Sequence, residues 1–370
     1  MPRYSAPDRF DHASPPKTAV LLVQLGTPDA AETAAVRRYL GQFLSDPRVV
    51  EIPRLIWWLV LNGIILRVRP SKSAAKYAEI WTPEGSPLLV NTQRQAALLS
   101  DALGSRGQDV EVAFAMRYGN PSVPSVMRRL RDRNVTRLLV VPMYPQYAGS
   151  TTASAFDAVW QELQGWRNLP ELRMVRGFHD APAYVDALAA RIRASWAEAG
   201  PPDRLVMSFH GVPKRTLLMG DPYHCECLVT GRLLAERLGL PPDRAVVTFQ
   251  SRFGRAEWLQ PYTAPTLEQL GRSGVGRVDV VCPGFVSDCL ETLEEISMEG
   301  RDAFFAAGGR EFRYIPCLND DPAFIDALAA LVEQHCAGWP IRRRTEEESA
   351  ALERGLQQRK RRAIELGASS

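Results

Sequence analysis

His210 lies in a sequence context that suits acid–base or metal chemistry. In the segment Ser208-Phe-His-Gly-Val-Pro213, a glycine directly after the histidine frees the backbone and a proline fixes the direction of the exit. An imidazole held rigidly at a strand end acts near neutral pH as a base or a metal ligand. A histidine with a purely structural role would have the same local sequence.

Three glutamates, Glu291, Glu295 and Glu299, recur at intervals of four residues. On an α-helix this spacing gives one carboxylate stripe opposite an apolar face. A solvated helix face is one interpretation. Like charges at this spacing repel unless a cation lies between them, and imidazole with carboxylates suits divalent first-row metals, including Fe²⁺. His210 and the three glutamates are therefore the candidate metal-handling residues.

An apolar segment, residues 52–70, contains the run Ile56-Trp-Trp-Leu59. Two adjacent tryptophans are costly to leave in water. The sequence leaves three interpretations open: a local core, a wall for a flat apolar ligand, or a membrane-facing lip with Arg67, Arg69 and Lys72 at the headgroups. The uncharged stretch Leu55–Leu66 is shorter than the roughly 20 residues that cross a bilayer.

The remaining motifs are weaker. His224-Cys-Glu-Cys227 has the residue types of a metal site, but it holds only two thiols without the paired CxxC spacing, which favours free cysteines beside a turn. The six sparse cysteines likewise predict free thiols. The chain has no P-loop, GxGxxG or GxSxG motif, which argues against nucleotide binding and serine hydrolase chemistry. With 45 basic and 42 acidic side chains, the net charge of +3 argues against nucleic-acid binding.

Short β-rich runs that alternate with helical patterns must position these residues. The expected strands are continuous apolar runs in which apolar and polar residues do not alternate, and amphipathic helices separate them. This pattern predicts an α/β fold with parallel sheets covered on both faces. The expected strands are Ala19–Leu25, Val110–Met116, Arg137–Val141, Arg204–Phe209, Ala245–Phe249 and Val278–Val281.

Each expected strand ends in a polar or aromatic residue followed by glycine or proline, and this pattern occurs in both halves. The 370 residues therefore predict two similar domains, the first with an insertion of about 50 residues that holds the apolar segment. Two doubly wound units that face each other would place their strand ends around one cleft.

Several segments, in order along both halves, resemble ferrochelatase, the enzyme family that inserts Fe²⁺ into protoporphyrin IX to complete haem. The resemblance implies two Rossmann-like, chelatase-type domains with a porphyrin cleft between them. The segments are Gly85-Ser-Pro87, Tyr144-Pro-Gln-Tyr147, Ser150-Thr-Thr152, Phe209-His-Gly-Val-Pro213 and Asp288–Ile296.

The resemblance also implies roles for individual residues. His210 matches the family's active-site histidine and Glu291 its paired glutamate, with Glu295 and Glu299 continuing the acidic line. The apolar lip (Ile56, Trp57, Trp58 and Leu59) would lie over the cleft. The implied porphyrin-binding residues are Leu25, Tyr77, Ser86, Arg117, Tyr118, Tyr147, Ser251, Trp258 and Phe285.

Three departures from the family pattern refine this expectation. Cys289 stands where many members have histidine, which puts proton relay through that side chain in doubt. Gly149 stands where animal members have a cysteine ligand of a [2Fe–2S] cluster, so no tightly bound cofactor is expected and Fe²⁺ is a substrate. Leu25 differs from the tyrosine of the coproporphyrin branch and favours protoporphyrin. The alternatives are a chelatase for coproporphyrin III or another divalent metal, and a non-catalytic porphyrin or haem carrier.

The expected partners are thus protoporphyrin IX and Fe²⁺, with peripheral membrane contact through the lip as an open alternative. Residues 1–17 have no secretory apolar region, so a cytoplasmic protein is expected, and the sequence leaves its oligomeric state open. We expect a flexible N-terminal tail (1–17), a first domain (18–170) with its insertion near 43–92, a second domain carrying the active-site His and Glu (171–320), a helix packing back on both (321–340), and a charged tail forming a solvated helix (341–370).

Overall fold

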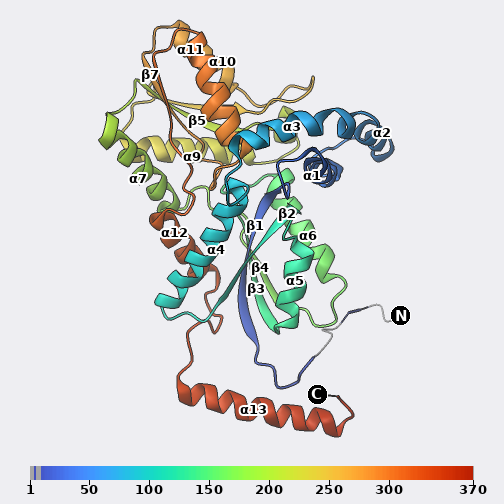
Figure 1. Ribbon diagram of the computed structural model, residues 1–370. Helices are drawn as coiled ribbons and strands as arrows, with labels where there is room; N and C mark the ends of the chain where they lie inside the picture. Colours follow the sequence, from blue (N-terminus) through green and yellow to red (C-terminus); the bar gives the residue numbers. More distant parts are fainter. Residues whose placement is uncertain (1–3, 6–9, 370) are drawn as a thin grey trace.

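The computed structural model describes residues 4–5 and 10–369, which are built around two four-stranded parallel sheets (Figure 1). The sheet orders are β2-β1-β3-β4 and β6-β5-β7-β8, so the two halves repeat one topology. This arrangement confirms the expected α/β class with two Rossmann-like units. The strands are β1 (Lys17–Thr27), β2 (Glu111–Gly119), β3 (Val135–Pro142), β4 (Glu171–Met174), β5 (Arg204–His210), β6 (Ala245–Gln250), β7 (Arg277–Val281) and β8 (Glu311–Tyr314).

The six expected strands are all present, whereas β4 and β8 were not expected. Each has only four residues and alternates charged with apolar side chains at a sheet edge. Because β4 pairs with β3, the first sheet continues to Met174, past the expected domain boundary at residue 170.

Helices cover both sheets. The first half contains α1 (Thr33–Ser45), α2 (Arg54–Val60), α3 (Leu66–Ile80), α4 (Pro87–Ser105), α5 (Val123–Asp132) and α6 (Ser154–Leu163), with short π-helices η1 (Leu61–Ile65) and η2 (Gly149–Ala153). The second half contains α7 (Pro182–Ala199), α8 (Lys214–Leu218), α9 (Tyr223–Leu238), α10 (Thr263–Arg272), the π-helix η3 (Glu291–Gly300), α11 (Arg301–Ala306), α12 (Pro322–His335) and α13 (Glu346–Glu365).

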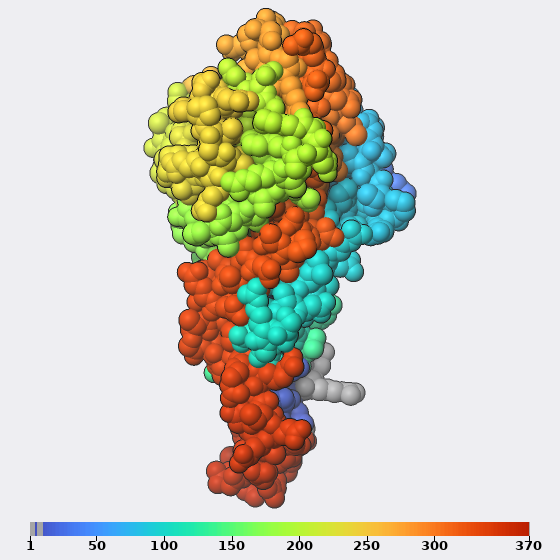
Figure 2. Space-filling view, turned by 90° about the vertical axis from the view of Figure 1, so that its left-hand side faces the viewer, coloured from blue at the N-terminus to red at the C-terminus, as the bar shows by residue number. Residues whose placement is uncertain are grey.

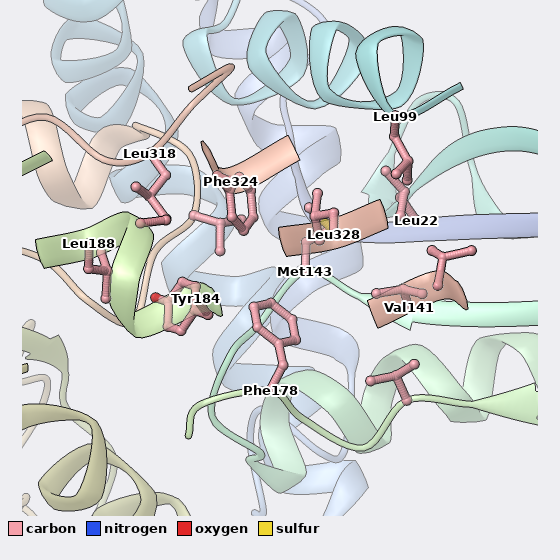
Figure 3. Close-up of a cluster of buried hydrophobic side chains, with 14 of the residues drawn as sticks. Leu22, Leu99, Val141, Met143, Phe178, Tyr184, Leu188, Leu318, Phe324 and Leu328 are labelled. Carbon is pink, nitrogen blue, oxygen red and sulfur yellow. The ribbon is translucent and has the colours of Figure 1, made fainter. Parts of the chain in front are cut away.

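One hydrophobic core extends across both halves. It joins β1, β3 and α4 of the first half to α7 and β5 of the second. Helix α12 completes it, and in Figure 3 Phe324 and Leu328 of α12 lie among side chains from these elements. Figure 2 shows the region of α12, in orange-red, between the second half and α4. Buried members of this core include Leu22, Leu99, Val141, Met143, Phe178, Tyr184, Leu188, Leu205, Phe209, Leu318, Phe324 and Leu328.

The insertion forms α2, η1 and α3, which extend away from the first sheet (Figure 1). Helix α3 buries Ala74, Tyr77 and Ile80 against Val36 of α1. Apolar side chains from residues 290–298 pack against the same cluster. The insertion therefore connects the first half to η3 of the second.

Helix α13 contacts residues 11–14, which precede β1. Helix α13 begins at a capping box formed by Thr345 and Glu348, and of its side chains only Leu356 is buried. Lys360 of α13 pairs with Asp11 at 2.9 Å. Lys17, expected to end the tail, is the first residue of β1, and the expected flexibility of residues 1–3 and 6–9 lies outside the described residues.

Candidate active site

His210 is the last residue of β5, and its ring is fixed by the adjacent backbone. The Nδ1 atom lies 2.6 Å from the carbonyl oxygen of Gly211. Because a carbonyl only accepts hydrogen bonds, Nδ1 must carry the proton. In the neutral ring the lone pair is then on Nε2, which is available to accept a proton or bind a metal.

Glu291 begins η3 and faces buried hydroxyl and thiol groups. Burial first, and then the charge of Glu291, raise the pKa of Cys289, whose thiol hydrogen-bonds this carboxylate. Burial and the same charge also raise the pKa values of Tyr39 and Tyr77. These three groups therefore stay protonated. Gln250, which pairs with His210 in the sheet, donates to the Glu291 carbonyl at 2.8 Å and links the two elements.

The expectation of an α-helical carboxylate stripe requires a correction, because residues 291–300 form a π-helix. Its i→i+5 bonding replaces the four-residue period. Glu295 is engaged by Ser251, whose N–H donates to Oε1 at 2.6 Å and whose hydroxyl donates to Oε2. Ser251 itself has a φ of 65°, a left-handed conformation that strains a non-glycine residue.

Glu294 and Glu299, five residues apart, share the ammonium group of Lys76 from α3. The distances are 2.8 Å to Glu294 and 2.9 Å to Glu299. Glu294 is buried, and burial, followed by repulsion from Glu299, raises its pKa against the opposing effect of Lys76. One cation from the insertion therefore bridges the two outer carboxylates of η3 and offsets one of their two negative charges.

Arg117 and Tyr118 end β2 and converge on Asp46, which follows α1. The Oδ2 atom of Asp46 lies 2.5 Å from the Arg117 guanidinium and accepts the Tyr118 hydroxyl at 2.7 Å and the Ser154 hydroxyl at 2.6 Å. Burial alone would raise the pKa of Asp46, but these donors, with the amide of Arg48, outweigh it and lower the pKa. Asp46 thus fixes both expected porphyrin-binding residues.

The other expected porphyrin-binding residues come from strand β1, from the start of α4 and from loops. Leu25 is half-buried in β1, and Ser86 accepts the Thr27 hydroxyl at 2.8 Å. The Phe285 ring lies 6.4 Å from the His210 ring, centroid to centroid. Trp258 has a buried Nε1 with no hydrogen-bond partner. Tyr147 follows β3, and the Arg176 guanidinium lies 4.4 Å from its ring centroid.

The two tryptophans of the apolar lip have different environments. Trp57 is buried and donates from Nε1 to the Leu44 carbonyl at 2.6 Å. Trp58 is 60% exposed, and Ile56 and Leu59 are each 58% exposed. The segment is therefore anchored by one tryptophan and presents the rest of its apolar side chains outward.

The weaker motifs show no metal centre. All six cysteines are free, as expected, and five are buried. Within residues 4–5 and 10–369, no three His, Cys, Asp or Glu side chains are arranged to hold a metal ion. Over the same part of the chain, no helix combines the length and the apolar character that a membrane crossing requires.

Sequence reasoning missed four residues that organise this site: Tyr39, Asp46, Lys76 and Glu226. Their partners lie far away along the chain, so local spacing carries no signal for Tyr39, Asp46 or Lys76. Glu226 lies inside the motif 224–227, whose two thiols indicate metal binding and give no sign that the carboxylate between them has a role.

Comparisons with known proteins identify the family and the fold. A family model described as Ferrochelatase matches residues 17–336. Three similar proteins are named ferrochelatase: one from Azoarcus sp. (strain BH72), 64% identical over 90% of this chain and 91% of its own; one from Polaromonas sp. (strain JS666), 62% identical over 90% and 91%; and one from Chromobacterium violaceum, 60% identical over 95% and 97%. The solved structure titled SirB from Bacillus subtilis with Fe3+ has a TM-score of 0.53 at 13% identity, covers 87% of this chain and 96% of its own, and shares the fold.

Proposed function

The chain belongs to the ferrochelatase family, and we propose that it performs the family's reaction at the strand ends around His210, with protoporphyrin IX as its porphyrin. It is a metal chelatase, a lyase that inserts Fe²⁺ into a porphyrin in haem synthesis. The reaction exchanges two pyrrole N–H protons for one Fe²⁺ ion. The protein must therefore bind a flat apolar ring, remove protons and admit a metal ion.

The observation that carries the proposal is the fixed orientation of the His210 ring. With Nδ1–H bonded to the Gly211 carbonyl, Nε2 is the atom that accepts a pyrrole proton or meets the incoming iron. Gln250, the sheet partner of His210, donates to the main-chain carbonyl of Glu291 and so joins β5 and β6 to the start of η3. In this proposal the Glu291 carboxylate stabilises the imidazolium that proton acceptance creates. Burial, and then the charge of Glu291, raise the pKa of Cys289 and keep its thiol protonated at the position where many family members have histidine.

The acidic residues of η3 supply a route for cations. Glu299 is exposed, whereas Glu294 is buried, and Lys76 pairs with both and offsets one of their two charges. Fe²⁺ that enters here displaces the ammonium group and moves toward Glu295 and Glu291, while protons move in the opposite direction. No resident cofactor is needed in this scheme, because Fe²⁺ is the substrate.

The character of the walls supports protoporphyrin over coproporphyrin III. Coproporphyrin carries two additional propionates where protoporphyrin has apolar vinyl groups. Leu25 offers an apolar, half-buried wall at the end of β1, and the charge of Arg117 is already paired with Asp46. Additional carboxylates would lack partners at these two positions.

The apolar lip supports peripheral contact of this protein, which the sequence predicts to be cytoplasmic, with a membrane surface. Trp58, Ile56 and Leu59 are exposed, and such a group on a helix favours insertion at the headgroup boundary. Arg67 and Lys72 follow along the chain and would meet anionic lipid.

Anaerobic incubation of the protein with Fe²⁺ and protoporphyrin IX, with coproporphyrin III in parallel, tests the function. The expected result is catalytic formation of protohaem, with kcat/KM at least about tenfold lower for coproporphyrin III, which corresponds to about 1.4 kcal/mol. Preferred turnover of coproporphyrin would overturn the substrate assignment. Stoichiometric porphyrin binding without turnover would make the protein a carrier.

A further inference from the structure

The loop that follows β3, residues 145–149, is attached to the start of α9 in the second half of the chain. The N–H of Tyr147 donates to Glu226 Oε2 at 2.6 Å. The N–H of Gly149 donates to Asp221 Oδ2 at 2.7 Å. Two carboxylates of one half therefore fix the loop of the other half that carries Tyr147, an expected porphyrin-binding residue, and Glu226 binds the backbone of Tyr147 itself.

The side chain of Tyr147 is fixed by the same carboxylate through an intermediate cation. Arg176 donates to Glu226 Oε1 at 3.0 Å, and its guanidinium carbon lies 4.4 Å from the centroid of the Tyr147 ring. Nδ1 of His179 lies 3.4 Å from Glu226 Oε2. One carboxylate thus orients both the backbone and, through Arg176, the ring.

The burial of Glu226 shows why this arrangement is stiff. Its side chain is only 9% exposed, and both of its oxygens are engaged, Oε1 by Arg176 and Oε2 by the N–H of Tyr147. Hydrogen bonds to a charged group are shorter and stronger than neutral ones. Tyr147, a loop residue that forms no hydrogen bonds of a β-sheet, thereby gains a fixed position. A side chain that is already fixed loses little conformational entropy when a ligand binds against it.

We propose that Glu226 is a positioning residue for porphyrin binding, which acts through Arg176 to hold the ring of Tyr147 in place. The inference rests on the proposed function, because it takes Tyr147 as part of the porphyrin wall. Glu226 does not touch the reacting atoms. Its loss therefore changes porphyrin affinity and KM rather than kcat.

A double-mutant cycle between Glu226 and Tyr147 tests the inference. Protoporphyrin dissociation constants are measured by fluorescence titration, and KM and kcat by metallation. Glu226→Gln is expected to raise the dissociation constant and KM about tenfold with kcat within about twofold, because a neutral amide no longer holds Arg176. In the Tyr147→Ala background the same change is expected to add less than twofold. Glu236→Gln, an exposed carboxylate on the same helix, is the matched control and leaves both constants unchanged.

Full additivity of the two substitutions, or unchanged affinity in Glu226→Gln, would overturn the inference. If Glu226→Gln fails to fold, Arg176→Ala replaces it in the cycle, since this side chain is 59% exposed. Absence of coupling between Arg176→Ala and Tyr147→Ala would then be the contradicting result. A wild-type protein that metallates no porphyrin would contradict the proposed function instead, so the two failures are distinguishable.

Discussion

Glycine at position 211 allows His210 to be held as closely as it is. A Cβ atom there would lie 2.6 Å from the Gln250 carbonyl oxygen and 3.2 Å from the Trp258 ring. The backbone N–H of Gly211 also donates to that carbonyl at 2.8 Å. A side chain at 211 would separate the ends of β5 and β6, and the orientation of the imidazole would be lost with them.

Asp46 gives a prediction at the same scale. Asp46→Asn is expected to lower the free energy of unfolding by about 2 to 4 kcal/mol at pH 7, because Arg117, Tyr118 and Ser154 lose a shared buried anion. The pKa of Asp46 is lowered in the folded state from its ordinary 3.8. The stabilisation is therefore fully present above that value and is lost as the pH falls through the lowered pKa.

Urea unfolding of both proteins between pH 7 and pH 3 measures the difference. The difference in free energy of unfolding between wild type and Asp46→Asn is expected to narrow toward pH 3. Asp326→Asn, in an exposed ion pair with Arg106, is the control and is expected to change stability by less than about 1 kcal/mol. A gap that stays constant over the whole range would show that the charge of Asp46 is not what stabilises the fold.

Residue types and spacing predict His210 and Glu291 as site residues, because the chemistry of each is visible in its own segment. Asp46 and Lys76 were not predictable in this way. Each is an ordinary charged residue on or beside a helix, and its meaning depends on partners that only the fold brings near.

At the scale of elements, η3 differs most from the sequence expectation. An α-helix would have aligned Glu291, Glu295 and Glu299, whereas the π-helix turns them toward different partners. Glu294 and Glu299 come together at Lys76 instead. Hydrophobic and charge periodicity cannot distinguish the two helix types over ten residues, so this feature was outside the reach of the sequence.

Replacing Lys76 tests the connection between the insertion and η3. Lys76→Gln is expected to lower the free energy of unfolding by about 1 kcal/mol at pH 8. Burial raises the pKa of Glu294 above its ordinary 4.5, so this carboxylate becomes protonated as the pH falls. A protonated Glu294 no longer needs the charge of Lys76. The loss of stability caused by Lys76→Gln is therefore expected to shrink toward pH 4. Chemical unfolding at the two pH values measures this, with Arg232→Gln as an exposed ion-pair control. A loss that grows at low pH would contradict the arrangement.

The apolar lip makes a prediction about two adjacent residues. Trp58→Ser is expected to weaken binding to anionic vesicles severalfold with little change in stability, because Trp58 is exposed. Trp57→Ser is expected to lower the free energy of unfolding by about 3 kcal/mol, because Trp57 is buried. Vesicle co-sedimentation and urea unfolding separate the two effects. Equal effects of both substitutions on stability would assign the segment to the core.

At the scale of the whole molecule, the duplication was visible in the sequence, but the shared core was not. Both halves show the same pattern at the ends of their strands, a polar or aromatic residue followed by glycine or proline. The packing of Leu328 of α12 into a core shared with the first half depends on contacts between distant parts of the chain, which leave no local signal in the sequence. Because one core joins both halves, calorimetry is expected to show a single unfolding transition. Leu328→Ala should move that transition as a unit, by about 2 to 5 kcal/mol of stability. Two separated transitions would contradict a common core.

The central claim is that Nε2 of His210 handles the pyrrole protons or the metal, while the walls bind the ring. The most direct measurement combines protoporphyrin binding and anaerobic Fe²⁺ insertion in one preparation of His210→Ala. His12→Ala, altered beside α13 and far from the site, is the matched control. The expected result is metallation at least about 100-fold slower in His210→Ala, with a dissociation constant for protoporphyrin within about threefold of wild type. Metallation by His210→Ala at a rate close to that of His12→Ala would contradict the account.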